Sequence, residues 1–135
     1  MSLTPAQPTY GTDAYINVLF NKTNEIVGHL NNYKVYSALL TQTGTDAPVA
    51  TVLENTLGLN PTYYYDGVGA YRLEDMQGLF TTGKTFVLGT GTGGAGISIN
   101  INDTTTIEIN CINMFEGTTQ DDILLDAGFE IRVYN

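Results

Sequence analysis

The sequence predicts a mainly β protein: an antiparallel β-sandwich of about eight short strands, preceded by one N-terminal α-helix. Residues that favour strands, above all Tyr, Thr, Val and Ile, recur in short runs from residue 33 to the end. The 15 glycines, together with Asn and Asp, place turn signals between these runs. Residues 12–32 show instead the periodicity of an amphipathic helix. These observations leave the strand order open between a jelly-roll-like arrangement and a meander.

The chain of 135 residues divides into three predicted parts. Residues 1–11 contain two prolines and a glycine and are expected to form an extended arm. Residues 12–32 are expected to form an oligomerisation helix, which Thr12 or Asp13 can cap. Residues 33–135 are expected to form the β-sandwich domain. With 42% hydrophobic residues, a chain of this length can bury one core.

The predicted helix carries an apolar seam with the heptad spacing of a coiled coil. The residues of the seam lie 3, 4, 3, 4 and 3 apart, and two further apolar residues widen the stripe: Ile16, Leu19, Thr23, Ile26, Leu30 and Tyr33, with Phe20 and Val27 beside them. Association between the helices of different subunits, most simply three, fits this pattern, and these residues are then the oligomer interface. Packing of the same stripe on the chain's own β-domain fits it as well.

The strands of the β-domain are predicted from apolar and β-branched runs bounded by turn residues. About eight segments qualify: 33–41, 49–55, 62–67, 69–75, 84–89, 97–102, 104–115 and 128–135. We expect Asp66–Gly67 at the turn of one hairpin and Asn102–Asp103 at the turn of another. The stretch "EGTTQDD" at 116–122 is expected to be a loop.

Residues 78–85 read "GLFTTGKT" and match the phosphate-binding pattern G-x-x-x-x-G-K-T. Phosphate binding by this pattern needs a helix directly after it, because the helix N-terminus supplies N–H groups and positive potential. The next residues, "FVLG", favour a strand, and the bulky Leu79 and Phe80 lie inside the loop. We therefore expect a turn at Thr82–Gly83 and no nucleotide site. The stretch "GTGTGG" at 89–94 fails the same test and is expected to be a flexible hairpin loop.

No group of residues in the sequence predicts catalysis. Cys111 lies among apolar residues of a predicted strand and is expected to be buried and inert, and the single histidine, His29, lies in another segment. Asp121 and Asp122 form the best local carboxylate cluster for a cation, but they lack the spacing of a calcium loop and are expected to be solvated. The sequence therefore predicts a protein that is not an enzyme, with no cofactor and no metal ligands.

The charge of the chain excludes two classes of partner. There are 14 Asp and Glu against 5 Lys and Arg, a net charge of −9. Nucleic acid requires a basic patch, and an anionic membrane surface is disfavoured for the same reason. No apolar run approaches the roughly 18 residues of a transmembrane helix. The N-terminal residues do not resemble a signal peptide, so we expect synthesis in a cytoplasm without export by that route.

The segment "YKVYSALLTQTGTDAPVATVLENTLG", residues 33–58, resembles a family of small bacteriophage and environmental-virus proteins. Members of that family share the pattern YKVYxALLTQxGTxAPxAxVLENTLG between a short N-terminal helix and a β-rich remainder. The stretch "FTTGKTF" at 80–86 is similar to a second element of the family. The resemblance implies a structural component of a virion, made in the host cytoplasm, and it carries over no catalytic residue.

The sequence thus predicts a non-enzymatic virion protein: an oligomeric, most simply trimeric, component of the head or tail surface such as a decoration, fibre or spike protein. Its expected partners are further copies of itself and other virion proteins. A second function, the binding of a host glycan or receptor, stays open. Tyr63–Tyr65 put aromatic side chains on both faces of a strand, and the loop at 89–95 would complete such a contact surface.

Overall fold

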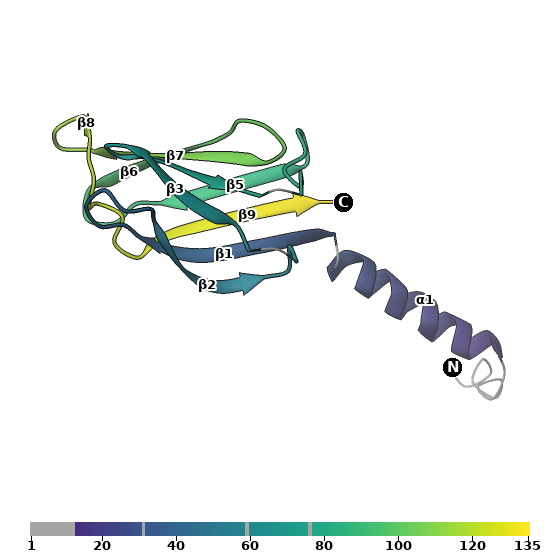
Figure 1. The fold of residues 1–135 in the computed structure, drawn as a ribbon. Coiled ribbons are helices and arrows are strands. Elements are labelled where there is room, and N and C mark those ends of the chain that lie inside the picture. Colours follow the sequence, from purple (N-terminus) through teal and green to yellow (C-terminus); the bar gives the residue numbers. More distant parts are fainter. Residues whose placement is uncertain (1–12, 31, 59, 76) are drawn as a thin grey trace. The chain divides into compact units, whose positions relative to one another are not determined.

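The computed structural model describes residues 13–30, 32–58, 60–75 and 77–135, which belong to two units, Met1–Asn32 and Tyr33–Asn135. The first unit contains helix α1, Asp13–Leu30 (Figure 1). The helix thus ends two residues before the predicted boundary at residue 32. The predicted arm 1–11 and the candidate cap Thr12 lie outside the described residues.

Two interactions within helix α1 involve its described polar side chains. The hydroxyl of Thr23 donates a hydrogen bond to the carbonyl of Leu19 at 2.8 Å, and Lys22 pairs with Glu25 one turn later at 3.1 Å. Its 18 residues give it a length of about 27 Å. Within the part of the chain that the structure describes, no helix has the length and apolar character needed to cross a membrane.

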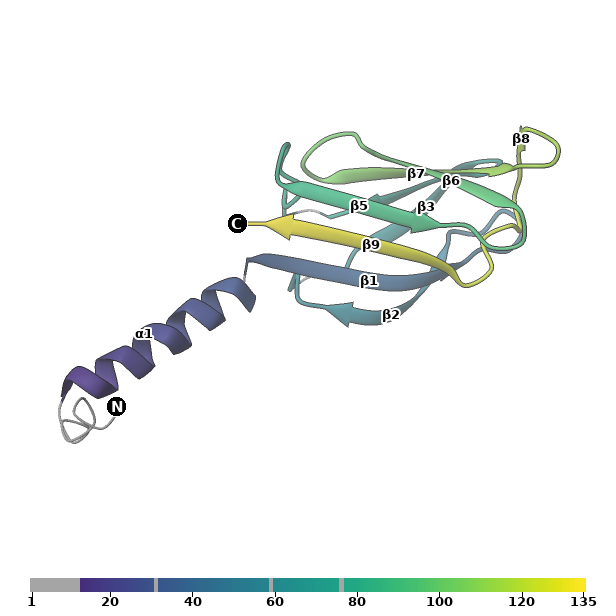
Figure 2. The same ribbon diagram turned by 180° about the vertical axis from the view of Figure 1, so that it is seen from behind.

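The second unit is a sandwich of two antiparallel sheets. Its described strands are β1 Tyr33–Thr41, β2 Val49–Asn55, β3 Thr62–Gly67, β4 Ala70–Glu74, β5 Thr85–Thr90, β6 Ala95–Ile101, β7 Thr106–Asn113, β8 Thr118–Thr119 and β9 Ala127–Tyr134. The first sheet has the order β2-β1-β9-β5, and the second has the order β3-β4-β7-β6 with β8 paired to β7. Both views show these two layers (Figures 1 and 2). The predicted mainly β sandwich preceded by one helix is confirmed.

The first and last strands of the β-domain lie side by side. β1 pairs with β9 from Tyr33 opposite Tyr134 to Leu40 opposite Ala127. This long-range pairing places the two ends of the domain at one end of the first sheet. The strands of that sheet are therefore not in chain order, unlike those of a simple meander.

The segment at 89–94 is not the hairpin loop that the sequence predicted. β5 belongs to the first sheet and β6 to the second, so this segment crosses from one layer to the other. β5 and β6 lie close together. If residue 89 had a Cβ atom, that atom would be only 2.6 Å from the Cδ1 atom of Ile99. The absence of a side chain at residue 89 therefore lets the two layers meet at this edge.

The core lies between the sheets and follows the alternation of the strands. Inward positions of β1 and β9 are buried and face those of β4 and β7, and Leu57, Phe80 and Leu124 close the core from the connecting segments. The buried strand residues are Tyr36, Ala38, Leu40, Tyr71, Leu73, Ile107, Ile109, Cys111, Ala127, Phe129 and Ile131. Burial of such side chains supplies the main driving force for folding.

Candidate interaction surfaces

The apolar seam of α1 is exposed. Among its apolar residues whose side chains are described, the exposed fraction ranges from 45% for Val27 to 62% for Phe20, and Ile16, Leu19 and Ile26 lie between these values. Isolated exposed apolar residues are common on protein surfaces, but a row at heptad spacing is typical of an interface. From Ile16 to Val27 the helix therefore presents an apolar stripe, interrupted by Thr23, that is suited to packing against another element.

Thr23, Leu30 and Tyr33 differ from the other predicted seam residues. The hydroxyl of Thr23 is bonded to the carbonyl of Leu19, so this polar position carries no unsatisfied donor into the seam. The side chain of Leu30 lies outside the described residues. Tyr33 does not continue the helix, because it is the first residue of β1. Its ring packs against that of Tyr134, with centroids 5.2 Å apart, and the guanidinium of Arg132 lies 5.1 Å from its centroid.

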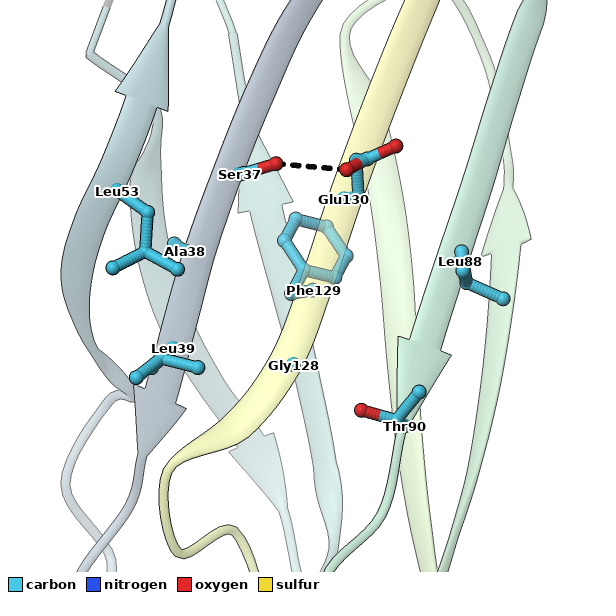
Figure 3. Close-up of a pocket in the computed structure, with 9 residues that line it drawn as sticks. All are labelled: Ser37, Ala38, Leu39, Leu53, Leu88, Thr90, Gly128, Phe129 and Glu130. Atoms are coloured by element: carbon cyan, nitrogen blue, oxygen red, sulfur yellow. Dashed lines mark hydrogen bonds between the residues drawn. The ribbon is translucent and has the colours of Figure 1, made fainter.

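A second apolar surface lies on the outer face of the first sheet. On this face, which we call the outer apolar face, Leu53 of β2 and Leu88 of β5 are 63% and 51% exposed, and Val49 and Phe86 are exposed as well. Leu39 of β1 completes the apolar set, half-buried between them. Leu39, Leu53 and Leu88 flank a shallow depression of about 200 Å³ over β1, β9 and β5 (Figure 3).

The depression has a simple cause in the sheet register. One cross-strand row reads Leu39, Gly128 and Thr90, so its middle position has no side chain. The next row reads Ser37, Glu130 and Leu88, and there the hydroxyl of Ser37 donates a hydrogen bond to Glu130 at 2.9 Å. The result is a hollow with apolar sides and one polar edge, open to solvent.

The sequence contained a signal for the outer apolar face that its alternation pattern did not reveal. The stretches "FVL" in β5 and "ALL" in β1 place apolar residues on both faces of their strands. Such unbroken apolar runs are typical of strands that are covered on both sides. Because these runs place apolar residues on the outward side of the strands as well as in the core, they predict a second contact surface on the outer side of the sheet.

The outer face of the second sheet has the opposite character. One cross-strand row there reads Tyr64, Arg72, Glu108 and Asn100. The guanidinium of Arg72 lies 4.4 Å from the centroid of the Tyr64 ring and pairs with Glu74 at 2.7 Å and with Asp66. Partly exposed ion pairs of this kind contribute little to stability but keep a surface hydrated. This face is suited to solvent.

The three tyrosines proposed as an exposed contact surface do not form one. Tyr63 and Tyr65 point inward and pack against the core. The hydroxyl of Tyr63 donates to that of Tyr36 at 3.2 Å, and the hydroxyl of Tyr65 donates to Asp121 at 2.9 Å. Burial raises the pKa of Tyr63 above its ordinary value. Tyr64 alone faces outward, and Arg72 stacks on it. The period-2 alternation of a strand explains this split.

The segment that matches the phosphate-binding pattern is a turn, as predicted. Thr82–Lys84 form the turn, and β5 begins at Thr85. The side chain of Phe80 is buried in the core, and its N–H donates to the carbonyl of Thr104 at 2.9 Å. A strand follows the lysine where nucleotide binding would require a helix, so the segment lacks the geometry that cradles phosphate.

Asp121 is bound by protein donors and is not solvated as expected, whereas Asp122 is exposed and accepts one protein hydrogen bond. The carboxylate of Asp121 accepts hydrogen bonds from the N–H of Gly69 at 2.7 Å and from the hydroxyls of Tyr65 and Tyr71 at 2.9 and 3.0 Å. Burial acts to raise the pKa of Asp121, but these hydrogen bonds outweigh it and hold the pKa below its ordinary value. Asp122 accepts a hydrogen bond from the N–H of Gly44 at 2.6 Å.

Residues suited to metal binding or nucleophilic chemistry do not gather in the described ranges. No group of three or more His, Cys, Asp or Glu side chains there has the geometry to hold a metal ion. Cys111 is fully buried, and burial raises the pKa of its thiol to about 12, so the thiolate is scarce at neutral pH. The side chain of His29 lies outside the described residues.

Comparisons of the chain with models of protein families, with curated proteins and with solved structures gave no significant match.

Proposed function

We propose that the chain is a non-enzymatic structural protein of a phage virion, an oligomeric component of the head or tail surface that assembles through α1. The observation that carries the proposal is the exposed heptad seam, whose Leu19 and Ile26 are each at least half exposed. An isolated helix of this length is marginally stable in water, since most helical stability in proteins comes from packing of the apolar face. Association of the seam with identical seams removes that face from water.

The width of the seam favours three helices over two. A dimeric coiled coil buries two residues per heptad, whereas Phe20 and Val27 add a third apolar position beside the seam. Ile26 occupies the d position, where isoleucine shifts the preference toward three or four strands. Thr23 at an a position is compatible with this arrangement, because its hydroxyl is satisfied within its own helix.

The assignment to a virion rests on the resemblance of residues 33–58 to phage proteins. The physical character of the chain supports it: a short association helix is joined to a β-domain whose polar surface is dominated by uncharged residues, with 14% charged residues in all. Glycan binding is less well supported, because two of the three tyrosines expected to contact a glycan, Tyr63 and Tyr65, pack against the core and bond within the domain. We therefore retain the structural role.

The test compares two charge-matched double variants of the full chain by light scattering. Leu19→Glu with Ile26→Glu places two carboxylates in the seam and is expected to reduce the solution mass to that of one chain, 14.6 kDa. Asn21→Glu with Asn24→Glu adds the same charge on the opposite side of the heptad and is expected to keep the wild-type mass. An unchanged mass in the seam variant would overturn the helix-mediated assembly.

A further inference from the structure

The outer apolar face is a candidate contact surface that is separate from α1. It lies entirely within the β-domain and contains no residue of the helical seam. Figure 3 shows Leu39 and Leu53 on one side of β9 and Leu88 on the other, with Gly128 between them. Single exposed leucines need no explanation, but a contiguous apolar face marks a site of interaction.

We propose that this face is the surface through which the β-domain contacts a second copy of the same chain. The charge of the face favours a copy as the occupant. Among the described strand residues that point outward here, the charged ones are Glu54 of β2, opposite Ser37, and Glu130 and Arg132 of β9, which form an ion pair at 2.5 Å. Two carboxylates and one guanidinium give the face a net charge of −1, so most of the net charge of −9 is carried elsewhere on the chain.

Two molecules that each carry −9 repel one another, and close approach costs least where the local charge is smallest. On the outer apolar face, Glu54 and Glu130 exceed Arg132 by one charge. On the outer face of the second sheet, Asp66, Glu74 and Glu108 exceed Arg72 by two charges. Like-charge repulsion therefore opposes self-association less at the first sheet than at the second.

A two-fold axis over the depression would bring identical surfaces together, so that a projecting Leu88 of each copy faces the depression of the other. Two sheets then pack face to face at about 10 Å, as the two sheets already do within one chain. In this arrangement Glu130 and Arg132 of one copy can exchange partners with those of the other.

The size of the face sets the strength of the contact. Four strands about 19 Å across, with about seven residues or 23 Å of length, give a plane of about 440 Å². That area matches functional patches on single proteins and falls short of the roughly 800 Å² per partner found in stable complexes. The face contact is therefore expected to be weak and is best detected by covalent capture.

The test uses the full chain with one added cysteine. Cys111 is buried and its thiol pKa is about 12, so the added residue is the reactive one. Leu88→Cys lies on the outer apolar face, and the matched control Ser98→Cys is exposed on the outer face of the second sheet. A short bis-maleimide is added to each, and the cross-linked dimer is quantified on a denaturing gel after thermal melts have confirmed folding.

We expect at least several-fold more dimer from Leu88→Cys than from Ser98→Cys, and the same preference from Thr90→Cys on the same face. Equal yields, or no dimer from either outer-face position, would overturn the proposal. The result is separable from the proposed role of α1. If light scattering gives the mass of one chain but Leu88→Cys still cross-links preferentially, only the assembly through α1 is contradicted. If the mass is that of an oligomer but cross-linking shows no preference, only the contact through the outer apolar face is contradicted.

Discussion

The buried amide of Gln42 accepts a hydrogen bond from the hydroxyl of Tyr71 at 2.8 Å. The same hydroxyl lies 3.0 Å from the carboxylate of Asp121, so its single proton is shared between two acceptors. Gln42 also accepts from the N–H of Asp122 and donates to the carbonyls of Gly44 and Asp46. One side chain of the β1–β2 connection therefore joins the second sheet to the segment that leads into β9.

Replacing Gln42 by leucine is expected to destabilise the β-domain by about 2 kcal/mol, because the part-buried hydrogen bonds to the carbonyl of Gly44 and from the N–H of Asp122 are lost together with the buried one from Tyr71. Tyr71→Phe is the matched comparison. It leaves each acceptor with another donor and is expected to cost about 1 kcal/mol. Denaturant unfolding followed by tyrosine fluorescence or circular dichroism measures both. Equal losses would contradict the account of this network.

Asp121 is expected to give the β-domain an acid-sensitive contribution to stability. The folded-state pKa of its carboxyl lies below the ordinary value of 3.8, so the ionised form is the one that folding favours. Its contribution is complete at pH values well above 3.8 and disappears as the pH falls through the folded-state pKa. Wild type should therefore be more stable than Asp121→Ala at neutral pH, and this difference in unfolding free energy should decrease as the pH falls below 3.8. Glu116→Ala, which removes an exposed carboxylate, serves as the control, and the same decrease in both variants would contradict this account.

Gly69, in the turn between β3 and β4, is expected to tolerate no side chain. Its φ is +67°, and a Cβ atom would lie 2.6 Å from the carbonyl oxygen of Cys111 and 2.8 Å from the nitrogen of Gln120. Gly69→Ala is expected to cost about 2–4 kcal/mol, because both obstacles are backbone atoms. Gly67→Ala, with nothing within 4 Å of its Cβ position, should change the melting temperature little. Similar melting temperatures for the two variants would contradict this prediction.

Local sequence signals predicted most of the strands. β1 and β2 coincide with the predicted segments 33–41 and 49–55, because each run of β-type residues is bounded by clear turn residues. β8 was missed, since two threonines within a loop carry no periodic signal. The pairing of β1 with β9 joins segments about as far apart as the domain allows, and no local pattern in either strand specifies its partner.

The candidate surfaces were predicted less completely, for physical reasons that differ. The seam of α1 could be found because heptad spacing is a local signal. The side chains of Tyr63 and Tyr65 point inward because their face of β3 packs on the core. Three consecutive tyrosines look alike on both faces of a strand, so the sequence does not show which face is buried. The hollow of the outer apolar face needs Leu39, Gly128 and Thr90 in one row, which is a property of the sheet register.

The central claim is that α1 assembles the chain into an oligomer. The most direct test is the solution mass of the full chain, measured by light scattering over a series of protein concentrations. We predict three times the chain mass of 14.6 kDa at the upper concentrations, with dissociation on dilution. A mass of one chain at every concentration would contradict the assembly of α1 through its apolar seam.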